Sequence, residues 1–295
     1  TVIGTSTSKD DLFLRFSSQE DYNTWVPTAT NTAGSFRIQD GSKIVTAVRS
    51  RNAVLVWTDT SLNALQFVGA PFTFNLTQIG ANCGAVGVHA AVDVNGIAYW
   101  MSQNAFYLYD GAVKKIPCSV QDYVFEDFSI TQQPETFAGV NSEFGEVIWF
   151  YPSESNSLNN GGTGDIDRYV IYNYAEQTWV YGSLSRTAWL DSGIENFPRA
   201  VSSGYLYQQE VGFDDDGSPM TNVFIESSDF DIGDGEQFSF IRRLIPDFKF
   251  LSNSGGGKVN IVVKTRNFPG DSLTTRATSS IGSTTQQSNI RARGR

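Results

Sequence analysis

The chain contains a single histidine, His89, and this limits the chemistry that the sequence can support. A nucleophile activated by histidine, or a metal site with several histidines, would have to be built around that one imidazole. His89 lies in the apolar, strand-like run 87–92, which has no G-x-S-x-G motif. We therefore predict a partly buried, structural histidine.

Carboxylates are the other side chains that could support catalysis, and Asp and Glu together number 31. A glycosidase needs two carboxylates at a defined separation across a sugar. Close pairs occur at Glu126 and Asp127, Asp165 and Asp167, and Asp229 and Asp231, but a sequence this acidic offers such pairs without showing which converge. The run 214–219 lacks the spacing and distal Glu of an EF-hand, so we interpret it as a solvated turn.

No Walker A or G-x-G-x-x-G motif is present, and the Gly-rich run 255–257 is typical of a hairpin tip. The sequence therefore predicts no catalytic, cofactor-binding or metal-binding residue. We expect a protein that is not an enzyme.

The elements that would position any site are short antiparallel strands. Two hairpins of one design, in 52–69 and 96–111, each have a strand ending on Trp, a polar turn and a second strand ending on Gly. Alternating apolar runs bounded by Asn, Asp, Ser and Gly are typical of such strands. Further repeats are predicted in 147–179 and in 204–212, and a degenerate one pairs 11–16 with 44–48.

A unit of roughly 40 to 50 residues that cannot bury its own faces is typical of a propeller blade. The predicted fold class is all-β, with a β-propeller-like body of repeated antiparallel hairpins or blades, incomplete at both termini. The one helix candidate is 119–128. Because the chain begins with Thr1 and not Met, we expect a fragment of a longer product.

Charge divides the chain into two predicted domains. Residues 1–240 contain 11 Lys and Arg against 29 Asp and Glu, a net charge of −18, whereas 241–295 contain 10 basic residues against 2 acidic ones, a net charge of +8. We predict an acidic, propeller-like body in 1–240 and a basic β segment in 241–295 that leads toward a missing C-terminal closure. Cys83 and Cys118 are predicted to be reduced, and no membrane span or signal peptide is visible.

The segment 20–34, EDYNTWVPTATNTAG, resembles the tail hub or nozzle proteins of short-tailed bacteriophages, also described as packaged-DNA stabilisation proteins. The similarity extends over nearly the whole chain. Further blocks that follow in the same order are 57–60, 96–111, 123–128, 146–152, 168–174 with Trp179, 186–189, 231–235, 245–248 and 291–295.

This resemblance implies a structural virion protein. Six copies would form a ring below the portal and adaptor, retain the packaged DNA and provide the channel for genome ejection. The implied partners are other copies of the chain, the adaptor and portal proteins, tail fibre or spike proteins, and double-stranded DNA that passes without sequence-specific binding. The implied location is the virion tail, after synthesis in the host cytoplasm. The family continues beyond the segment 291–295 and begins before Thr1.

An acidic inner wall would let DNA pass, since phosphate contacts come from Lys and Arg. Seven acidic residues are therefore candidates for the channel or a subunit seam: Asp10, Asp11, Asp165, Asp167, Asp214, Asp215 and Asp216. The alternative is that they lie in ordinary solvated loops. Two other functions stay open. A carbohydrate-binding or carbohydrate-active propeller predicts converging acids and stacked aromatic rings, and an intracellular scaffold predicts a peptide-binding monomer.

Overall fold

The computed structural model describes residues 2–3, 9–193, 195–212, 214–215, 217–219, 223–230, 237–250 and 257–294. Antiparallel strands dominate these residues, and their one α-helix is α1, Gln121–Glu126. The protein is therefore all-β, as predicted, and α1 confirms the helix expected within 119–128.

The chain divides into two compact units, Thr1–Gly212 and Phe213–Arg295, which we call unit 1 and unit 2. This boundary differs from the change of charge at residue 240. Unit 1 contains 11 basic and 21 acidic residues, a net charge of −10, and unit 2 contains 10 of each, a net charge of zero. The basic segment 241–295 is thus one part of unit 2, and acidic residues precede it in the same unit.

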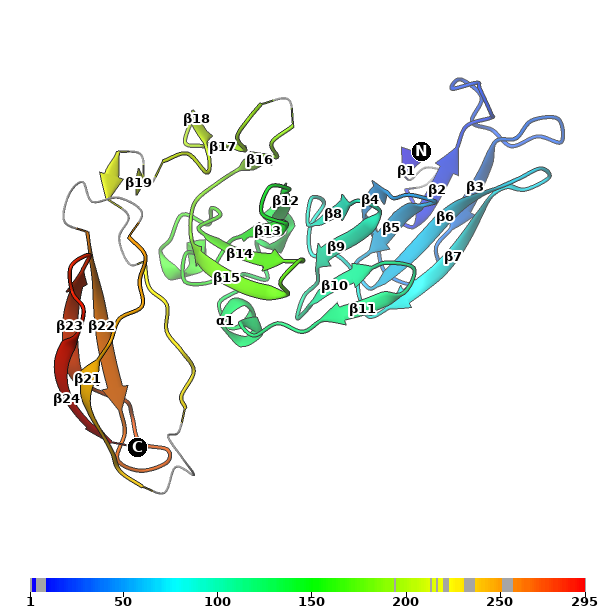
Figure 1. Cartoon of the computed structure of the whole chain (residues 1–295). Helices are drawn as coiled ribbons and strands as arrows, with labels where there is room; N and C mark the ends of the chain where they lie inside the picture. The colour runs from blue at the N-terminus through cyan, green and yellow to red at the C-terminus, as the bar shows by residue number, and fades with distance from the viewer. Residues whose placement is uncertain are drawn as a thin grey trace. The chain divides into compact units, whose positions relative to one another are not determined.

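Unit 1 is a series of antiparallel sheets, each built from strands that are neighbours in sequence (Figure 1). The first sheet contains β1 (Val2–Ile3), β2 (Phe13–Phe16) and β3 (Gly34–Arg37). The second contains β4 (Ile44–Arg49), β5 (Val54–Thr58), β6 (Ser61–Gly69) and β7 (Thr73–Ala81). The third contains β8 (Ala91–Val94), β9 (Ile97–Met101), β10 (Phe106–Tyr109) and β11 (Val113–Ile116).

The later sheets of unit 1 repeat this arrangement. The fourth contains β12 (Phe137–Asn141), β13 (Glu146–Tyr151), β14 (Arg168–Asn173) and β15 (Thr178–Ser183). The last contains β16 (Ala188–Leu190), β17 (Arg199–Ser202) and β18 (Tyr205–Gln208). Over the described residues, these sheets do not close into a barrel or a complete propeller.

Turn chemistry explains why such strands pair locally. Asn95 and Gly96 join β8 to β9 with φ angles of 54° and 88°. Two consecutive positive φ values define the turn that matches the right-handed twist of a hairpin, and Asn followed by Gly favours it. The Asp93 carboxylate accepts a hydrogen bond of 2.9 Å from the Gly96 N–H and holds the turn closed.

Tryptophans on the second strand of successive sheets hold the sheets together. Trp57, Trp100 and Trp149 have no exposed surface, as expected for core residues. The Trp100 indole N–H donates to the carbonyl of Cys83 at 2.7 Å, and that of Trp149 donates to the carbonyl of Ala90 at 3.1 Å. Both carbonyls lie in the segment between β7 and β8, which connects the second sheet to the third. The Trp100 and Trp149 indoles therefore link their own sheets to this connection.

The first strands of adjoining sheets also approach one another, in the order β4, β8, β12 and β16. Between the third and fourth sheets this contact includes a backbone hydrogen bond of 2.8 Å from the Ala138 N–H to the His89 carbonyl. The second to fifth sheets of unit 1 are therefore joined at their first strands, and they pack through shared apolar clusters.

Two predicted hairpins are wrong in their pairing. The segments 11–16 and 44–48 do form strands, but β2 pairs with β1 and β3, and β4 pairs with β5. The strand in 204–207 pairs backward with β17 and not forward with 211–212. In both cases the strand pairs with a neighbour that is nearer in sequence. A shorter loop lowers the entropic cost of bringing the two strands together.

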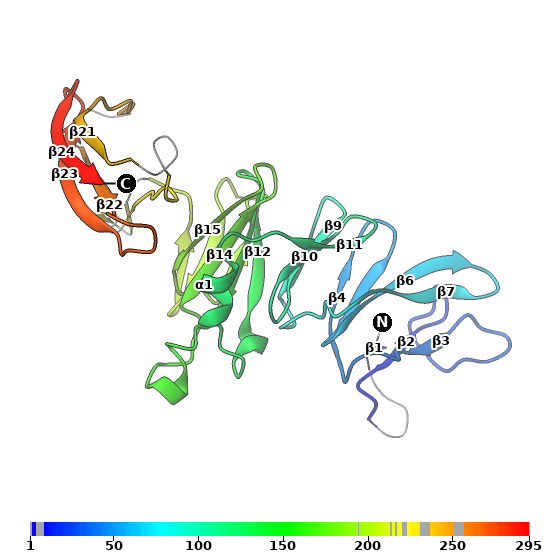
Figure 2. The ribbon, with the colours of Figure 1, turned by 90° about the horizontal axis from the view of Figure 1, so that it is seen from below.

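Unit 2 contains β19 (Asp214–Asp215), β20 (Ser218–Pro219), β21 (Ser239–Leu244), β22 (Lys258–Thr265), β23 (Thr274–Gly282) and β24 (Ser288–Gly294). β21 pairs with β24, and β22 pairs with β23. β23 and β24 lie side by side, which brings the two pairs together (Figure 2). Ile281, Ile290 and Ala292 are the apolar side chains buried among the described residues of this unit.

Candidate functional site

The first pair of predicted acidic residues is held by local contacts. The Asp10 carboxylate accepts hydrogen bonds from the Leu12 N–H at 3.1 Å and from the Arg37 guanidinium at 2.8 Å. These two contacts, the backbone one first, lower the pKa of Asp10. Asp11 is exposed and forms an ion pair with Lys9 at 3.4 Å. Asp10 therefore stabilises the start of β2.

The two acids of the second predicted pair, Asp165 and Asp167, lie in different environments. Asp167 accepts hydrogen bonds of 2.8 Å from both the N–H and the hydroxyl of Ser153, whereas the neighbouring Asp165 is exposed. The same pair of contacts, from the N–H and the hydroxyl of one serine, recurs at Asp59. Its carboxylate accepts from the N–H of Ser42 at 2.8 Å and from the Ser42 hydroxyl at 2.5 Å. Asp167 is thus part of a recurring Asp–Ser contact that the sequence reasoning missed.

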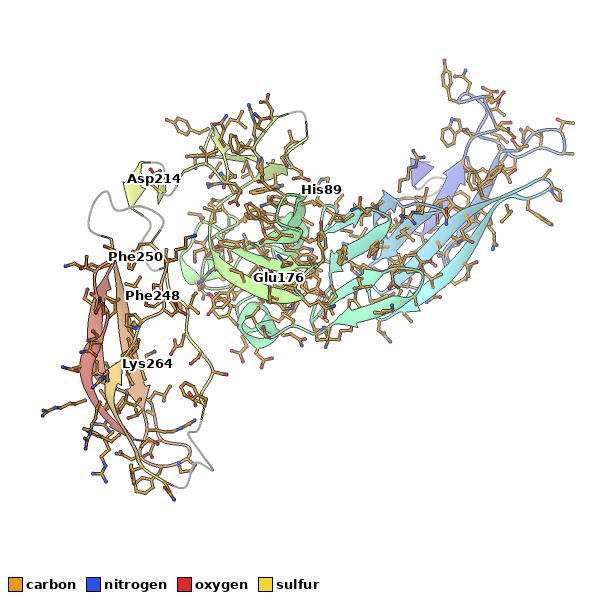
Figure 3. All side chains as sticks on the ribbon, viewed as in Figure 1. His89, Glu176, Asp214, Phe248, Phe250 and Lys264 are labelled. Atoms are coloured by element: carbon orange, nitrogen blue, oxygen red, sulfur yellow. The ribbon has the colours of Figure 1, made fainter. Side chains whose placement is uncertain are left out.

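The third predicted group lies in unit 2, at the turn between β19 and β20 (Figure 3). Asp214 is exposed and accepts a hydrogen bond of 3.0 Å from the Gly217 N–H, as in the predicted solvated turn. Asp215 pairs with Ser218 through its backbone, and its side chain lies outside the described part of the chain. Asp216 lies outside the described residues, as do the motif 231–235 and the glycines 255 and 256.

One pair of acids from different segments does converge, on Arg168. Its guanidinium lies 3.4 Å from Asp127 and 3.4 Å from Asp167, and it donates to the Tyr123 hydroxyl at 2.9 Å. The Ser155 N–H and hydroxyl also donate to Asp127, both at 2.9 Å. The two carboxylates share the Arg168 cation and are hydrogen-bonded by serines, so this group is a structural ion-pair network. It does not resemble a glycosidase pair.

The prediction for His89 is wrong. Its side chain is exposed, and it lies in the turn before β8 (Figure 3). The apolar run 87–92 indicated a strand, but here the chain bends to bring the His89 carbonyl to β12. Cys83 and Cys118 are free, and burial raises the pKa of each thiol to about 11. Such thiols are mostly protonated and weakly nucleophilic at neutral pH.

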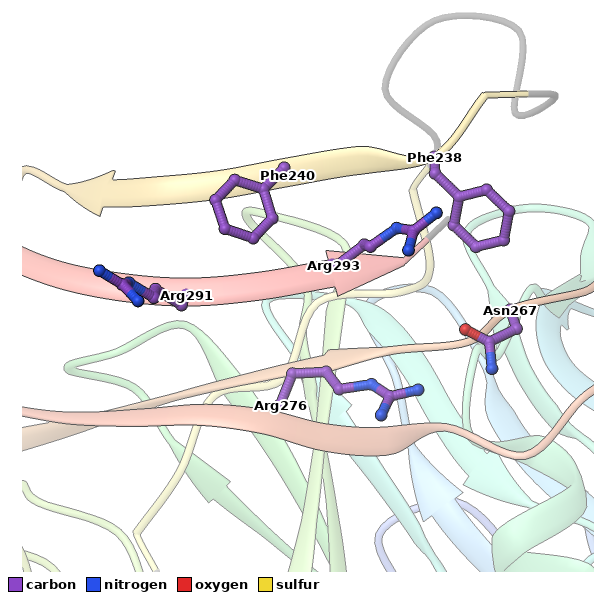
Figure 4. A pocket seen from close by; sticks show the side chains of 6 residues that line it. All are labelled: Phe238, Phe240, Asn267, Arg276, Arg291 and Arg293. Carbon is purple, nitrogen blue, oxygen red and sulfur yellow. The ribbon is translucent and has the colours of Figure 1, made fainter.

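The most distinctive site of unit 2 is an open pocket of about 490 Å³ on β21, β23 and β24 (Figure 4). We call it the arginine pocket, and it is lined by Phe238, Phe240, Asn267, Arg276, Arg291 and Arg293. Phe240 lies directly opposite Arg293 across the β21–β24 pair. Residues two apart on a strand point to one face about 6.6 Å apart, which explains why Arg291 and Arg293 line the pocket together.

Aromatic rings and one buried hydroxyl hold the arginines in place. The Arg293 guanidinium lies 4.8 Å from the centre of the Phe238 ring, within the range of a cation–π contact. The Thr265 hydroxyl donates to the Arg293 carbonyl at 3.0 Å and accepts from the Arg276 Nε at 3.3 Å. In the described part of the chain, none of the three pocket arginines forms an ion pair with a carboxylate.

A complementary group of acids lies in unit 1, at the turn between β12 and β13. Glu143, Glu146 and Glu210 form what we call the glutamate cluster. Asn141 is opposite Glu146 in the strand pair and donates to Glu210 at 3.5 Å. Burial, and then repulsion from another member of the cluster, raise the pKa of both Glu146 and Glu210. Asn141 is fully buried, and its side-chain oxygen has no hydrogen-bond partner.

Within the described residues, no cluster of His, Cys, Asp or Glu has the geometry of a metal site. None of the helices in that part of the chain is both long and apolar enough to cross a bilayer. In comparisons with known proteins, no family model matches the sequence and no curated protein matches it significantly.

Proposed function

We propose that this chain is a structural protein of a bacteriophage tail, a hub or nozzle subunit that forms a ring below the portal and adaptor. One observation carries the proposal. The sheets of unit 1 follow one another in chain order, and the second to fifth are joined at their first strands. In a β-propeller, the first strands of the blades surround the axis, so this arrangement supports a propeller-like body.

The chemistry of unit 1 supports a passive, load-bearing role. Apolar clusters between successive sheets give a rigid packed body, because protein interiors are close-packed. The net charge of −10 on unit 1 disfavours tight binding of DNA phosphates and is compatible with a channel through which DNA moves. Asp11 and Asp165 are exposed and remain candidates for such a wall.

A carbohydrate-active propeller has less support. Trp57, Trp100 and Trp149 are fully buried, so their rings cannot stack on a sugar. The converging acids Asp127 and Asp167 are bound by Arg168 and by serines. The chain is accordingly proposed to be a scaffold and not an enzyme.

The test is to mix the full-length protein with its portal and adaptor rings and to measure mass by native mass spectrometry and symmetry by electron microscopy. Six copies in an axial ring with an open channel are expected. A protein that stays monomeric and ignores the portal and adaptor rings would overturn the proposal. Glycan binding in the same preparation would favour the carbohydrate alternative.

A further inference from the structure

The arginine pocket and the glutamate cluster are each a group of like charges. Among the described residues, no Lys or Arg forms an ion pair with Glu143, Glu146 or Glu210, just as no carboxylate pairs with the pocket arginines. Like charges placed together repel one another unless an opposite charge approaches them. Each group therefore has the electrostatic character of one half of an interface.

A buried polar atom marks the glutamate cluster as incomplete. Asn141 has no exposed surface, its amide group contacts Glu210, and no described residue donates to its side-chain oxygen. A buried acceptor without a partner is unfavourable, because it loses its contact with water and gains no hydrogen bond in return. A guanidinium brings five N–H donors, so it can serve a carboxylate and a nearby carbonyl oxygen together. The cluster thus offers acceptors of the kind that arginine satisfies.

The pocket offers the matching donors. Arg291 and Arg293 are exposed on one face of β24 and line the pocket with Arg276. The guanidinium groups of Arg293 and Arg276 point toward Phe238 and Asn267, and that of Arg291 points the other way (Figure 4). Planar guanidinium groups bind carboxylates through two parallel hydrogen bonds. Phe238 and Phe240 are 42% and 50% exposed in the pocket, and Phe144 is 48% exposed in the turn that carries Glu143. Both groups therefore combine charge with exposed aromatic surface.

We infer that the arginine pocket of one copy receives the glutamate cluster of a second copy of this chain. The inference rests on the proposed ring and names the contact through which neighbouring copies meet. Because the pocket and the cluster are built from different residues, the contact is heterologous, and repetition of a heterologous contact generates a ring when the rotation closes. The net charge of −10 on the whole chain favours this occupant over nucleic acid, since an acidic chain repels phosphates.

Charge-reversal variants of the full chain test this inference by analytical ultracentrifugation at low ionic strength. The native chain is expected to self-associate and to dissociate as salt is added. R291E/R293E reverses the pocket, and E143R/E210R reverses the cluster. Each variant alone should associate at least about tenfold more weakly, since like charges then meet. An equimolar mixture should associate again, with the two variants alternating, because both contacts between unlike copies then join opposite charges.

Matched controls change the net charge by the same amount at other exposed residues. K249E/K258E serves as the control for the pocket, and E126R/E135R serves for the cluster. Both controls should associate like the native chain. R291Q/R293Q provides a milder pocket variant if the reversed one does not fold, as judged by circular dichroism, and it should also associate more weakly.

Several results would overturn the inference. A native chain that stays monomeric at every protein concentration would do so, and so would reversed variants that associate normally or a mixture that stays monomeric. Binding of a fluorescent oligothymidylate that requires Arg291 and Arg293, with self-association unchanged, would identify the pocket as a nucleic-acid site instead. If the reversed variants still join a ring on the portal and adaptor, the proposed function stands and this contact fails. If the mixture of reversed variants associates but the native chain forms no ring on the portal and adaptor, this contact stands and the proposed function fails.

Discussion

At the scale of single residues, the acids of unit 1 fall into distinct electrostatic classes that their sequence positions do not distinguish. Asp167 is held by Ser153 and Arg168, Asp165 is exposed, and Glu146 lies in a cluster without a described cation. The first class stabilises the fold, whereas the last lowers stability until a partner supplies positive charge. Substitutions should therefore have opposite effects in the two classes.

Arg168 should be stabilising. Arg168→Met removes the contacts to Asp127, Asp167 and Tyr123 and leaves two neighbouring carboxylates without their cation. We expect a loss of about 1–3 kcal/mol in the free energy of unfolding at pH 7, measured by urea titration. Lys114→Met removes an exposed pair with Asp110 and should cost less than about 0.5 kcal/mol. Equal losses in the two variants would contradict the structural network.

Glu146 should be destabilising at neutral pH. Burial and the nearby Glu210 raise its folded-state pKa, so folding disfavours its charged form. The destabilisation is present above the folded pKa and disappears below the unfolded pKa of about 4.3. Glu146→Gln should stabilise an isolated copy by a few tenths of a kcal/mol at pH 7, because the carboxyl is half exposed, and should change nothing near pH 3.

The measurement for Glu146→Gln is urea unfolding at several pH values, in moderate salt and at low protein concentration so that copies do not associate. Glu176→Gln changes an exposed carboxyl and is the matched control, expected to have no effect at any pH (Figure 3). Destabilisation at pH 7 by Glu146→Gln would mean that the carboxylate has a favourable partner in the isolated chain.

At the scale of elements, the packing of one sheet on the next depends on how closely a side chain of one sheet approaches the backbone of the other, as well as on the apolar area that is buried. A Cβ added to Gly139 on β12 would lie 2.6 Å from the Trp189 ring on β16. That ring donates its N–H to the Val140 carbonyl at 2.8 Å, which fixes its position. Gly139→Ala should therefore force the last sheet of unit 1 away from β12, at a cost of about 1–3 kcal/mol.

Guanidinium unfolding followed by tryptophan fluorescence measures this effect. Gly193→Ala is the control, because an added Cβ there meets nothing within 4 Å. Trp189→Leu in the Gly139→Ala background should lose less than the sum of the two single changes, since the smaller side chain relieves the clash. Additive losses would show that the contact between these residues is not the cause.

The strands were predictable because their information is local, whereas the sites were not. Val54 to Trp57 and Ile97 to Trp100 have the alternating, β-branched pattern of strands, and both segments form them. The R-x-R spacing of Arg291 and Arg293 could also have indicated one basic face. By contrast, Asn141 and Glu210 are 69 positions apart. Their contact depends on how one sheet packs on the next, which periodicity does not encode.

At the scale of the whole molecule, the two units should differ in stability. Unit 1 has large apolar clusters with several buried tryptophans, whereas the buried apolar side chains described in unit 2 are Ile281, Ile290 and Ala292. Hydrophobic stabilisation is roughly proportional to the apolar area removed from water. We therefore expect unit 2 to unfold at a lower denaturant concentration than unit 1.

The aromatic residues make this difference measurable. All 6 Trp and all 12 Tyr lie in 1–212, so tryptophan fluorescence reports on unit 1 alone, while far-ultraviolet circular dichroism reports on the strands of both units. The dichroism signal should show an early transition that fluorescence lacks. Ile281→Ala should shift only that early transition, and Val147→Ala only the later one, each lowering the stability of its own unit by about 1–5 kcal/mol. Coincident transitions that both substitutions shift together would mean that the two units unfold as one cooperative body.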